Sequence, residues 1–496
     1  MRSLTYLTLT ISLSLFLLLG CAVGPHYAGV PQDKLPSRFK NAFGFHRHSK
    51  ETAAQERKPI GPWWEIFHDR ILNELEREAY DANQDLRIAL ARLSEARAQT
   101  RVAAADFFPT VNLDPSAERQ RTSNTLPFQR GKLIGPNPFG GGSTGSDLVL
   151  NNQPLSRTYN LFRFPFDLNW EVDLFGRVRH NVEAAKATVE SGEADLENLR
   201  LTVTANVAAD YFNLRGLDAE VAVLEQTIKT RRDALEIAQE RLQAGLTSEL
   251  DVVRAQSDLA GNEANLISVQ RTRGDMENAL ASLLGRTASS FALPADPHVP
   301  EPPHIPAGIP SQLLERRPDV ASAERQLAAA NARIGVATAA FFPQIKLTGA
   351  GGFESADLGL LFQAQSHIWQ IGPSITFPIF EGGRNTANLQ AARARYEEQV
   401  GNYRKQVLVA FQEVETALND LRTLASEAEA QGRAVAAAQR GLDLSAQQYG
   451  KGAVTYVDVL DAQRTLLSDQ RSSVQLLGQR AQATVQLIKA LGGDWR

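Results

Sequence analysis

The chain has 496 residues and lacks several features that reveal function in other proteins. Its one cysteine cannot form a disulfide within the chain. Its net charge of −4 is not the basic excess expected of a nucleic-acid-binding protein. After an N-terminal apolar stretch, no segment reaches the roughly 20 apolar residues that a membrane-spanning helix needs. We therefore expect no nucleic acid as partner, and any membrane crossing by the mature chain must use strands.

Catalytic signatures are also missing from the sequence. We find no nucleophile elbow, P-loop or dinucleotide fingerprint. The eight histidines show no metal-ligand spacing, and His46 and His48 flank Arg47 in a polar segment typical of a surface. We expect a protein that is not an enzyme and carries no cofactor or metal, so any energy must come from a partner.

The first residues are informative because they have the organisation of a secretory signal peptide. A positive charge at Arg2 is followed by a short apolar core and by Leu-Leu-Gly-Cys at residues 18–21. This ending resembles a bacterial lipobox, in which the cysteine becomes the first mature residue and carries lipid. We expect removal of residues 1–20 and lipid attachment at Cys21. Residue 22 is alanine, not the aspartate of the usual inner-membrane retention signal, which favours the outer membrane.

The chain contains an internal two-fold repeat. RVAAADFFPTVNL (101–113) recurs as GVATAAFFPQIKL (335–347), and RLQAGLTSELDVVRAQSDL (241–259) recurs 207 residues later as QYGKGAVTYVDVLDAQRTL. We therefore divide the mature chain into an extended N-terminal segment, a first repeat, a proline-rich linker and a second repeat: 21–68, 69–292, 293–310 and 311–492. Each repeat should contain a helix, roughly 69–106 or 311–340, then two strands, then a long helical hairpin at about 178–285 or 384–492.

The helix expected at 178–244 contains no proline and would be on the order of 100 Å long. Its apolar residues alternate in spacing between four and three, as in a coiled-coil seam, and Arg231 is the one break. We interpret the seam as packing between helices and not as a ligand site.

The expected strands alternate between apolar and polar residues. In FRFPFDLNWEVDLFG (162–176) the even positions are apolar and the odd positions are mostly charged or polar. We expect four strands, at about 110–119, 160–175, 344–353 and 366–380. A soluble sheet packed on helices would alternate in the same way, but the signal peptide and lipobox favour an outer-membrane barrel. Four strands cannot close a barrel, so several chains must share one.

Together these features resemble the outer-membrane efflux factors of the TolC and OprM type, in the lipoprotein branch often called the NodT family. The resemblance rests on CAVGPHY, PWWEIFHD, the two Phe-Phe-Pro sites, VDLFGRVR, VDVLDAQ and ALGGDW. It implies an α+β membrane protein, a homotrimer whose twelve strands form one barrel continued by a long periplasmic helical barrel. It also implies a passive exit duct in the outer membrane, supplied by an inner-membrane pump through a periplasmic adaptor.

The two duplicated turns, AGLTSELD (244–251) and KGAVTYVD (451–458), would then lie at the periplasmic tip. Glycine at both turns suits a helix end that needs positive φ. By position, the resemblance makes six residues candidates for adaptor contact: Gly245, Leu246, Thr247, Gly452, Ala453 and Val454. The alternative is that they only form a turn.

Asp458 and Asp461 lie three residues apart and thus on one helical face. In a trimer they would form two acidic rings, and crowding should raise the pKa of their carboxyls. The alternative is a solvated pair near a helix start. The resemblance to the TolC aperture favours a gate, with Tyr449 and Asp251 as a hydrogen-bonded latch between neighbouring helices. Val454 stands where TolC has a locking arginine, so apolar packing is an alternative means of closure.

Three other hypotheses about the function of the protein stay open. A lipid-anchored periplasmic coiled-coil scaffold would need no barrel strands, and a lipoprotein enzyme has no motif to support it. An exit channel of a secretion system would share the same architecture. Within the channel reading, drugs, solvents, metals and secreted molecules are equally compatible substrates.

Overall fold

The computed structural model describes residues 22–30, 36, 39–41, 62–121, 158–303, 305 and 316–493. The predicted signal peptide, Cys21 and residues 122–157 between the first two expected strands lie outside the described residues. The chain forms two compact units. The first unit includes residues 101–182 and 332–391, which contain all the described strands. The second unit contains most of the helical residues.

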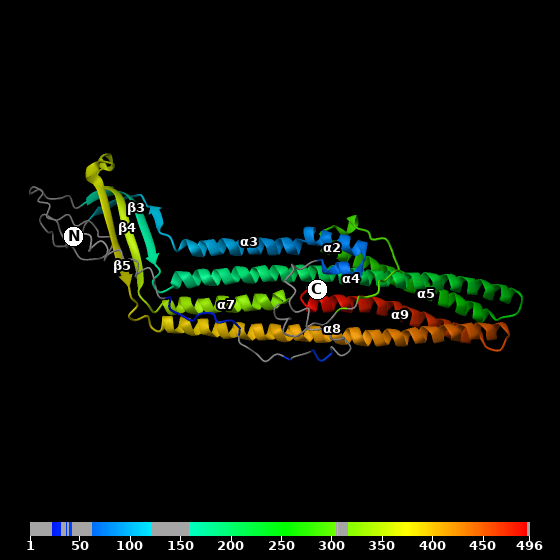
Figure 1. Ribbon diagram of the computed structural model, residues 1–496. Coiled ribbons are helices and arrows are strands. Elements are labelled where there is room, and N and C mark those ends of the chain that lie inside the picture. The colour runs from blue at the N-terminus through cyan, green and yellow to red at the C-terminus, as the bar shows by residue number, and fades with distance from the viewer. Residues whose placement is uncertain are drawn as a thin grey trace, which may run out of the picture. The chain divides into compact units, whose positions relative to one another are not determined.

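The strand unit is one antiparallel sheet. Its members are β1 (Thr110–Leu113), β2 (Ser116–Arg121), β3 (Thr158–Val172), β4 (Gln344–Ser355) and β5 (His367–Thr376). β3 and β4 are central, β5 forms one edge, and β1 and β2 pair successively with β3 along the other edge (Figure 1). The sheet therefore has four strand positions, as predicted, but the expected strand at 110–119 is split. Pro115 has no amide proton to donate, and the β3 register continues unchanged on either side of it. The expected strand at 366–380 ends earlier, at Thr376.

The register places apolar residues of β1, β3, β4 and β5 on one face, to which β2 contributes Ala117, Arg119 and Arg121. Phe164 of β3 pairs with Phe353 of β4, which pairs with His367 of β5. The same face continues along the strands with Phe166, Leu168, Trp170, Val111, Leu113, Leu347, Ile345, Trp369, Ile371 and Ile375. Trp369, Ile371 and Ile375 of the edge strand β5 are 74%, 65% and 67% exposed. No described part of the chain therefore covers these side chains of the apolar face.

The opposite face of the sheet is polar. Arg163 forms an ion pair with Glu354 across β3 and β4 at 3.0 Å. Glu171 lies opposite Lys346 in the same pair of strands. The alternation predicted from the sequence is therefore confirmed in the register.

Gly352 allows β4 to approach β3 at Pro165. A Cβ on Gly352 would lie 2.1 Å from the carbonyl oxygen of Phe164 and 2.8 Å from the Cα of Pro165. Neighbouring Gly351 has open space at the same position. Gly352 is thus required by a close approach of backbone, and Gly351 is not.

The helical unit is built on two helical hairpins. α4 (Arg177–Gln243) and α8 (Arg384–Gly450) each have 67 residues, whereas α5 (Glu249–Leu283) and α9 (Tyr456–Ala490) each have 35. α5 lies alongside α4 and α9 alongside α8, with both connecting turns at the same end (Figure 1). Shorter helices α2 (Arg70–Ala82), α3 (Gln84–Ala105) and α7 (Pro318–Ala339) complete it. None of the helices in the described ranges is long and apolar enough to cross a membrane.

The helix expected at 69–106 is interrupted, which corrects the prediction. Asn83 is extended, with φ −60° and ψ 130°, and separates α2 from α3. Its side chain accepts from the amide of Leu86 at 3.1 Å and donates to the carbonyl of Leu283 at 2.8 Å. The break is stable because Asn83 caps the start of α3 and also binds the end of α5.

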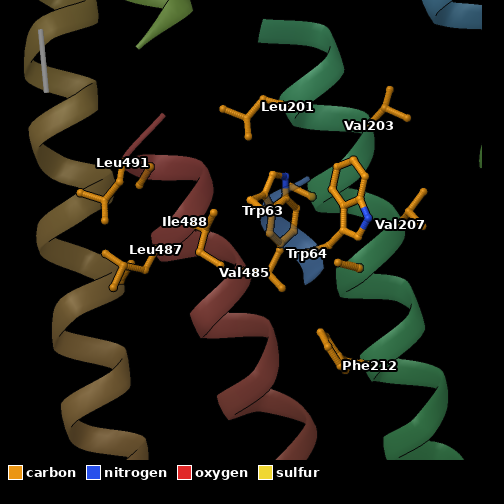
Figure 2. Packing of buried hydrophobic residues seen from close by; sticks show 14 of the residues in the cluster. Trp63, Trp64, Leu201, Val203, Val207, Phe212, Val485, Leu487, Ile488 and Leu491 are labelled. Carbon is orange, nitrogen blue, oxygen red and sulfur yellow. The ribbon is translucent and has the colours of Figure 1, made fainter. Parts of the chain in front are cut away.

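The seam predicted on α4 is confirmed as packing. Leu224 and Ile228 are buried, and Leu224 packs with Val269 of α5 and Leu467 of α9. The main core lies beside PWWEIFHD, where Trp63 and Trp64 sit between α4 and α9 (Figure 2). The indole of Trp63 donates to Thr204 at 3.2 Å.

The start of the proline-rich linker is held by buried charges. Asp218 is 3% exposed and accepts from Arg215, Arg273 and the amide of Asp296 at 3.0, 2.6 and 3.0 Å. Arg215 also donates to the carbonyl of Pro294 at 2.8 Å. The described linker residues form neither helix nor strand, and the first of them are bound to the helices.

Candidate functional site: the duplicated helix turns

The turns at the ends of α4 and α8 have the same hydrogen-bonded geometry. Gly245 and Gly452 have φ of 72° and 73°, the left-handed conformation that glycine adopts most readily. The amide of the next residue, Leu246 or Ala453, donates to the carbonyl five residues before it at 2.8 and 2.9 Å. Both helices therefore end in a Schellman motif, and the backbone conformation explains the glycine in each.

The following helices begin with aspartates that accept hydrogen bonds from the turn. Asp458 accepts from the amide and hydroxyl of Thr455 at 2.8 and 2.7 Å, which forms a capping box. Asp251 accepts from Thr247 at 2.8 Å and from Ser248 at 3.3 Å. These aspartates stabilise the starts of α9 and α5.

Within one chain, the hydrogen bonds from Thr455 lower the pKa of the Asp458 carboxyl below its usual value. Asp458 is also exposed to water, which favours the charged form, so its carboxyl is ionised at neutral pH. The predicted rise in pKa concerned carboxylates from several chains, and it stays a prediction.

Asp461 lies one turn further along α9, on the same helical face as Asp458. Its side chain is 68% exposed, and its nearest cation is Arg464 at 3.9 Å. An exposed pair at that distance contributes little to stability. The structure therefore brings two exposed carboxylates together on one face at the start of α9, as the spacing predicted.

Tyr449 packs against an aromatic ring and a guanidinium group within the chain. Its ring lies 5.6 Å from that of Tyr456, and the Arg241 guanidinium stacks 4.9 Å above it. Among the described residues of this chain, Tyr449 has no hydrogen bond to Asp251. Tyr449 thus packs the end of α8 against α4 and α9, and the latch between neighbouring helices stays a prediction.

The candidate adaptor residues are accessible. Leu246 is 68% exposed, Gly245, Gly452 and Ala453 are exposed, and Thr247 and Val454 are half-buried. Leu250 and Val253 on α5 are also more than half exposed. Leu250 and Val253 lie three residues apart on one face of α5, and Leu246 lies in the turn just before it. We call these three exposed residues the apolar stripe of the first turn. Sequence reasoning missed this stripe, although its spacing was visible.

A buried charge cluster behind the turns was also missed. Asp258 of α5 pairs with Arg231 of α4 and Arg464 of α9, each at 2.9 Å. Arg231 and Asp258 are 4% and 7% exposed, and burial lowers the pKa of Arg231. The signal was the single arginine that breaks the α4 seam, because a charge in a seam requires a buried partner.

Arg464 also lines an open groove between α5 and α9. The groove has a volume of about 510 Å³, and its walls include small residues such as Ser257, Gly261 and Ser468. In the described part of the chain, no group of three or more histidine, cysteine, aspartate or glutamate side chains could hold a metal ion.

Comparison with known proteins identifies the family. The family model described as outer membrane efflux protein matches residues 75–286 and 309–493, which include all four long helices and every strand of the sheet. The chain belongs to the outer membrane efflux protein family. The match falls in two segments on either side of the linker.

Relatives of this outer membrane efflux protein align over almost its whole length. The probable efflux pump outer membrane protein TtgC of Pseudomonas putida is 33% identical over 492 residues, covering 98% of this chain and 95% of TtgC. The probable outer membrane lipoprotein SilC of Salmonella typhimurium is 30% identical over 487 residues, covering 97% of each. The solved structure of the Campylobacter jejuni CmeC outer membrane channel is 25% identical with a TM-score of 0.80, and 96% of this chain matches 95% of that one.

Proposed function

We propose that this protein is the outer-membrane channel of a tripartite efflux pump. It acts as a passive exit duct for substrates delivered by an inner-membrane transporter through a periplasmic adaptor. The observation that carries this proposal is the sheet, which has a mostly apolar face, a mostly polar face and two edges that pair with no other described strand. A lipid-anchored coiled-coil scaffold would have no use for such a sheet.

The proposed barrel is shared by three copies of the chain. An unpaired strand edge cannot lie in hydrocarbon, because its amides and carbonyls would lose their hydrogen bonds. Here β1 and β2 form one edge and β5 the other, so each edge can pair with the opposite edge of the next copy. β3, β4 and β5 have 15, 12 and 10 residues, long enough for tilted transmembrane strands. Four strand positions in each of three copies would give a closed barrel of twelve strands.

In this barrel the apolar face contacts lipid and the polar face lines a water-filled bore. The lining would include the Arg163–Glu354 pair, Asp167 and the opposed Glu171 and Lys346. Both signs of charge are present, which fits a duct with little selectivity of its own. Substrate choice would then lie with the inner-membrane transporter.

The duplicated turns would form the periplasmic tip. The exposed stripe of Leu246, Leu250 and Val253 offers an apolar surface for the adaptor's helical hairpin. Asp458 and Asp461 would face the axis and form the acidic gate, and Tyr449 and Asp251 of neighbouring copies would form the latch. Val454, half-buried beside them, would add apolar packing to the closed state.

A lipid on Cys21 would anchor the chain, and the relative SilC is itself a probable outer membrane lipoprotein. The described chain begins one residue later and is held against the strand unit. The amide of Val23 donates to the carbonyl of Phe175 at 3.1 Å, and its carbonyl lies 3.1 Å from Nε2 of His180. The attachment point would therefore be fixed next to the end of β3.

Cysteine cross-linking tests the shared barrel. Asn112→Cys on β1 should be combined in turn with Gln370→Cys, Ser374→Cys or Thr376→Cys on β5. At least one pair should give disulfide-linked dimers and trimers on non-reducing gels. The control pairs the same β5 cysteines with Asp167→Cys on central β3, which should give no links between chains. Absence of interchain links from every edge pair would contradict the shared barrel.

A further inference from the structure

The connection between β4 and β5 carries exposed apolar residues in an ordered conformation. Leu358, Leu360 and Phe362 are 62%, 47% and 64% exposed. They lie in or beside two short 3-10 turns, η4 (Leu358–Leu360) and η5 (Ala364–Ser366). The carboxylate of Asp357 accepts from the amide of Gly359, and Ser366 donates to the carbonyl of Leu360, both at 2.8 Å. The loop is thus fixed by its own hydrogen bonds with its apolar side chains turned outward.

The loop folds back over the apolar face of the sheet. The ring of Phe362 makes edge contacts with Phe164 at 5.5 Å and with Phe353 at 5.6 Å. Phe164 and Phe353 are register partners on the apolar face. Phe362 therefore lies on the apolar face of the sheet and not on its polar face.

This end of the sheet is opposite the end that leads into the long helices. β3 ends just before α4 and β5 just before α8, so the β4–β5 turn lies at the far end of the strands (Figure 1). In the proposed barrel that end is the extracellular one.

We propose that Leu358, Leu360 and Phe362, here named the loop anchor, insert among acyl chains of the outer leaflet. This inference rests on the proposed barrel. Three large apolar side chains held in water on one ordered loop mark an interaction surface. Lipid is the occupant because Phe362 packs on the central strands β3 and β4 and not on the edge strand β5, which meets the neighbouring copy. Aromatic side chains at the membrane boundary are also typical of outer-membrane barrels.

Fluorescence quenching tests the loop anchor. Leu358→Cys and Phe362→Cys are each labelled with a small environment-sensitive fluorophore and reconstituted in vesicles that contain lipid brominated in its acyl chains. Gln365→Cys, in the same loop but polar, is the matched control. Ile371→Cys on the apolar face of β5 reports the barrel itself, and wild-type protein sets the labelling background of Cys21.

Brominated lipid should quench the labels at 358 and 362 at least about two-fold more than the label at 365. Quenching at 371 with none beyond the control at 358 and 362 would overturn the loop anchor and leave the barrel intact. No quenching at 371 either would overturn both. Spontaneous disulfide dimers of Leu358→Cys would show that a second copy covers the loop, which also overturns the proposal.

Discussion

Glu76 of α2 is fully buried, and neither of its carboxylate oxygens has a hydrogen-bond partner among the described residues. Burial raises the pKa of this carboxyl well above its ordinary value. The folded state therefore holds a proton on Glu76 at pH values where the unfolded chain has released it. This single residue should make the folded state less stable as pH rises above the unfolded pKa of about 4.3.

Glu76→Gln should remove this pH dependence, because the amide has nearly the same shape and does not ionise. Denaturant unfolding of the purified protein at pH 5 and pH 8 measures the effect. The wild type should lose more stability between these pH values than the variant. Glu95→Gln, on the exposed side of α3, is the control and should behave like the wild type. Equal losses of stability in Glu76→Gln and the wild type would contradict the prediction that ionisation of buried Glu76 destabilises the folded state.

The hydrogen bonds from Thr455 to Asp458 should stabilise the start of α9. Asp458→Ala removes the acceptor for Thr455 and should cost about 1 kcal/mol of stability at the start of α9. Asp458→Asn keeps an acceptor oxygen and should cost less. Faster amide hydrogen exchange in the first turn of α9 in the alanine variant, and not in the asparagine variant, is the measurement.

Among the elements, α4, α5 and α9 are joined by the Arg231–Asp258–Arg464 cluster. Asp258→Leu leaves Arg231 buried without a counter-charge and should cost about 3–5 kcal/mol. Adding Arg231→Leu restores the seam and should recover most of that loss, because Arg464 stays solvated. Denaturant unfolding of the two variants measures this, and equal stability of the single and double variants would contradict the pairing.

The sheet offers a matched pair of glycines. Gly352→Ala places a methyl group against the Phe164 carbonyl and should reduce the yield of assembled protein in the membrane. Gly351→Ala has room and should assemble like the wild type. Semi-native gels of outer-membrane extracts report the assembled fraction, and similar fractions for both variants would show that the close approach is not required.

The sequence predicted those elements that have a strong local period. Alternation predicted β3 closely, and the heptad spacing predicted the buried face of α4. The break at Asn83 was missed because its stabilising contact to Leu283 is 200 residues away. The cluster around Asp258 was missed for the same reason, since its members come from three helices. Local patterns identify elements, whereas contacts between elements depend on the folded chain.

The whole molecule combines a sheet that has one mostly apolar face with helical hairpins whose turns carry exposed carboxylates. The first feature supports a pore through the outer membrane, and the second supports a gate at its periplasmic tip. Asp458 and Asp461 can be tested without loss of the helix cap, because asparagine keeps the acceptor at position 458.

Single-channel conductance in planar bilayers tests the central claim most directly. The wild-type protein and the Asp458→Asn/Asp461→Asn double variant should be compared in the same lipid and salt. A pore with an acidic gate predicts a small wild-type conductance that increases when the two charges are removed. A double variant that inserts as readily but conducts like the wild type would contradict the acidic gate, and failure of both proteins to insert would contradict the channel.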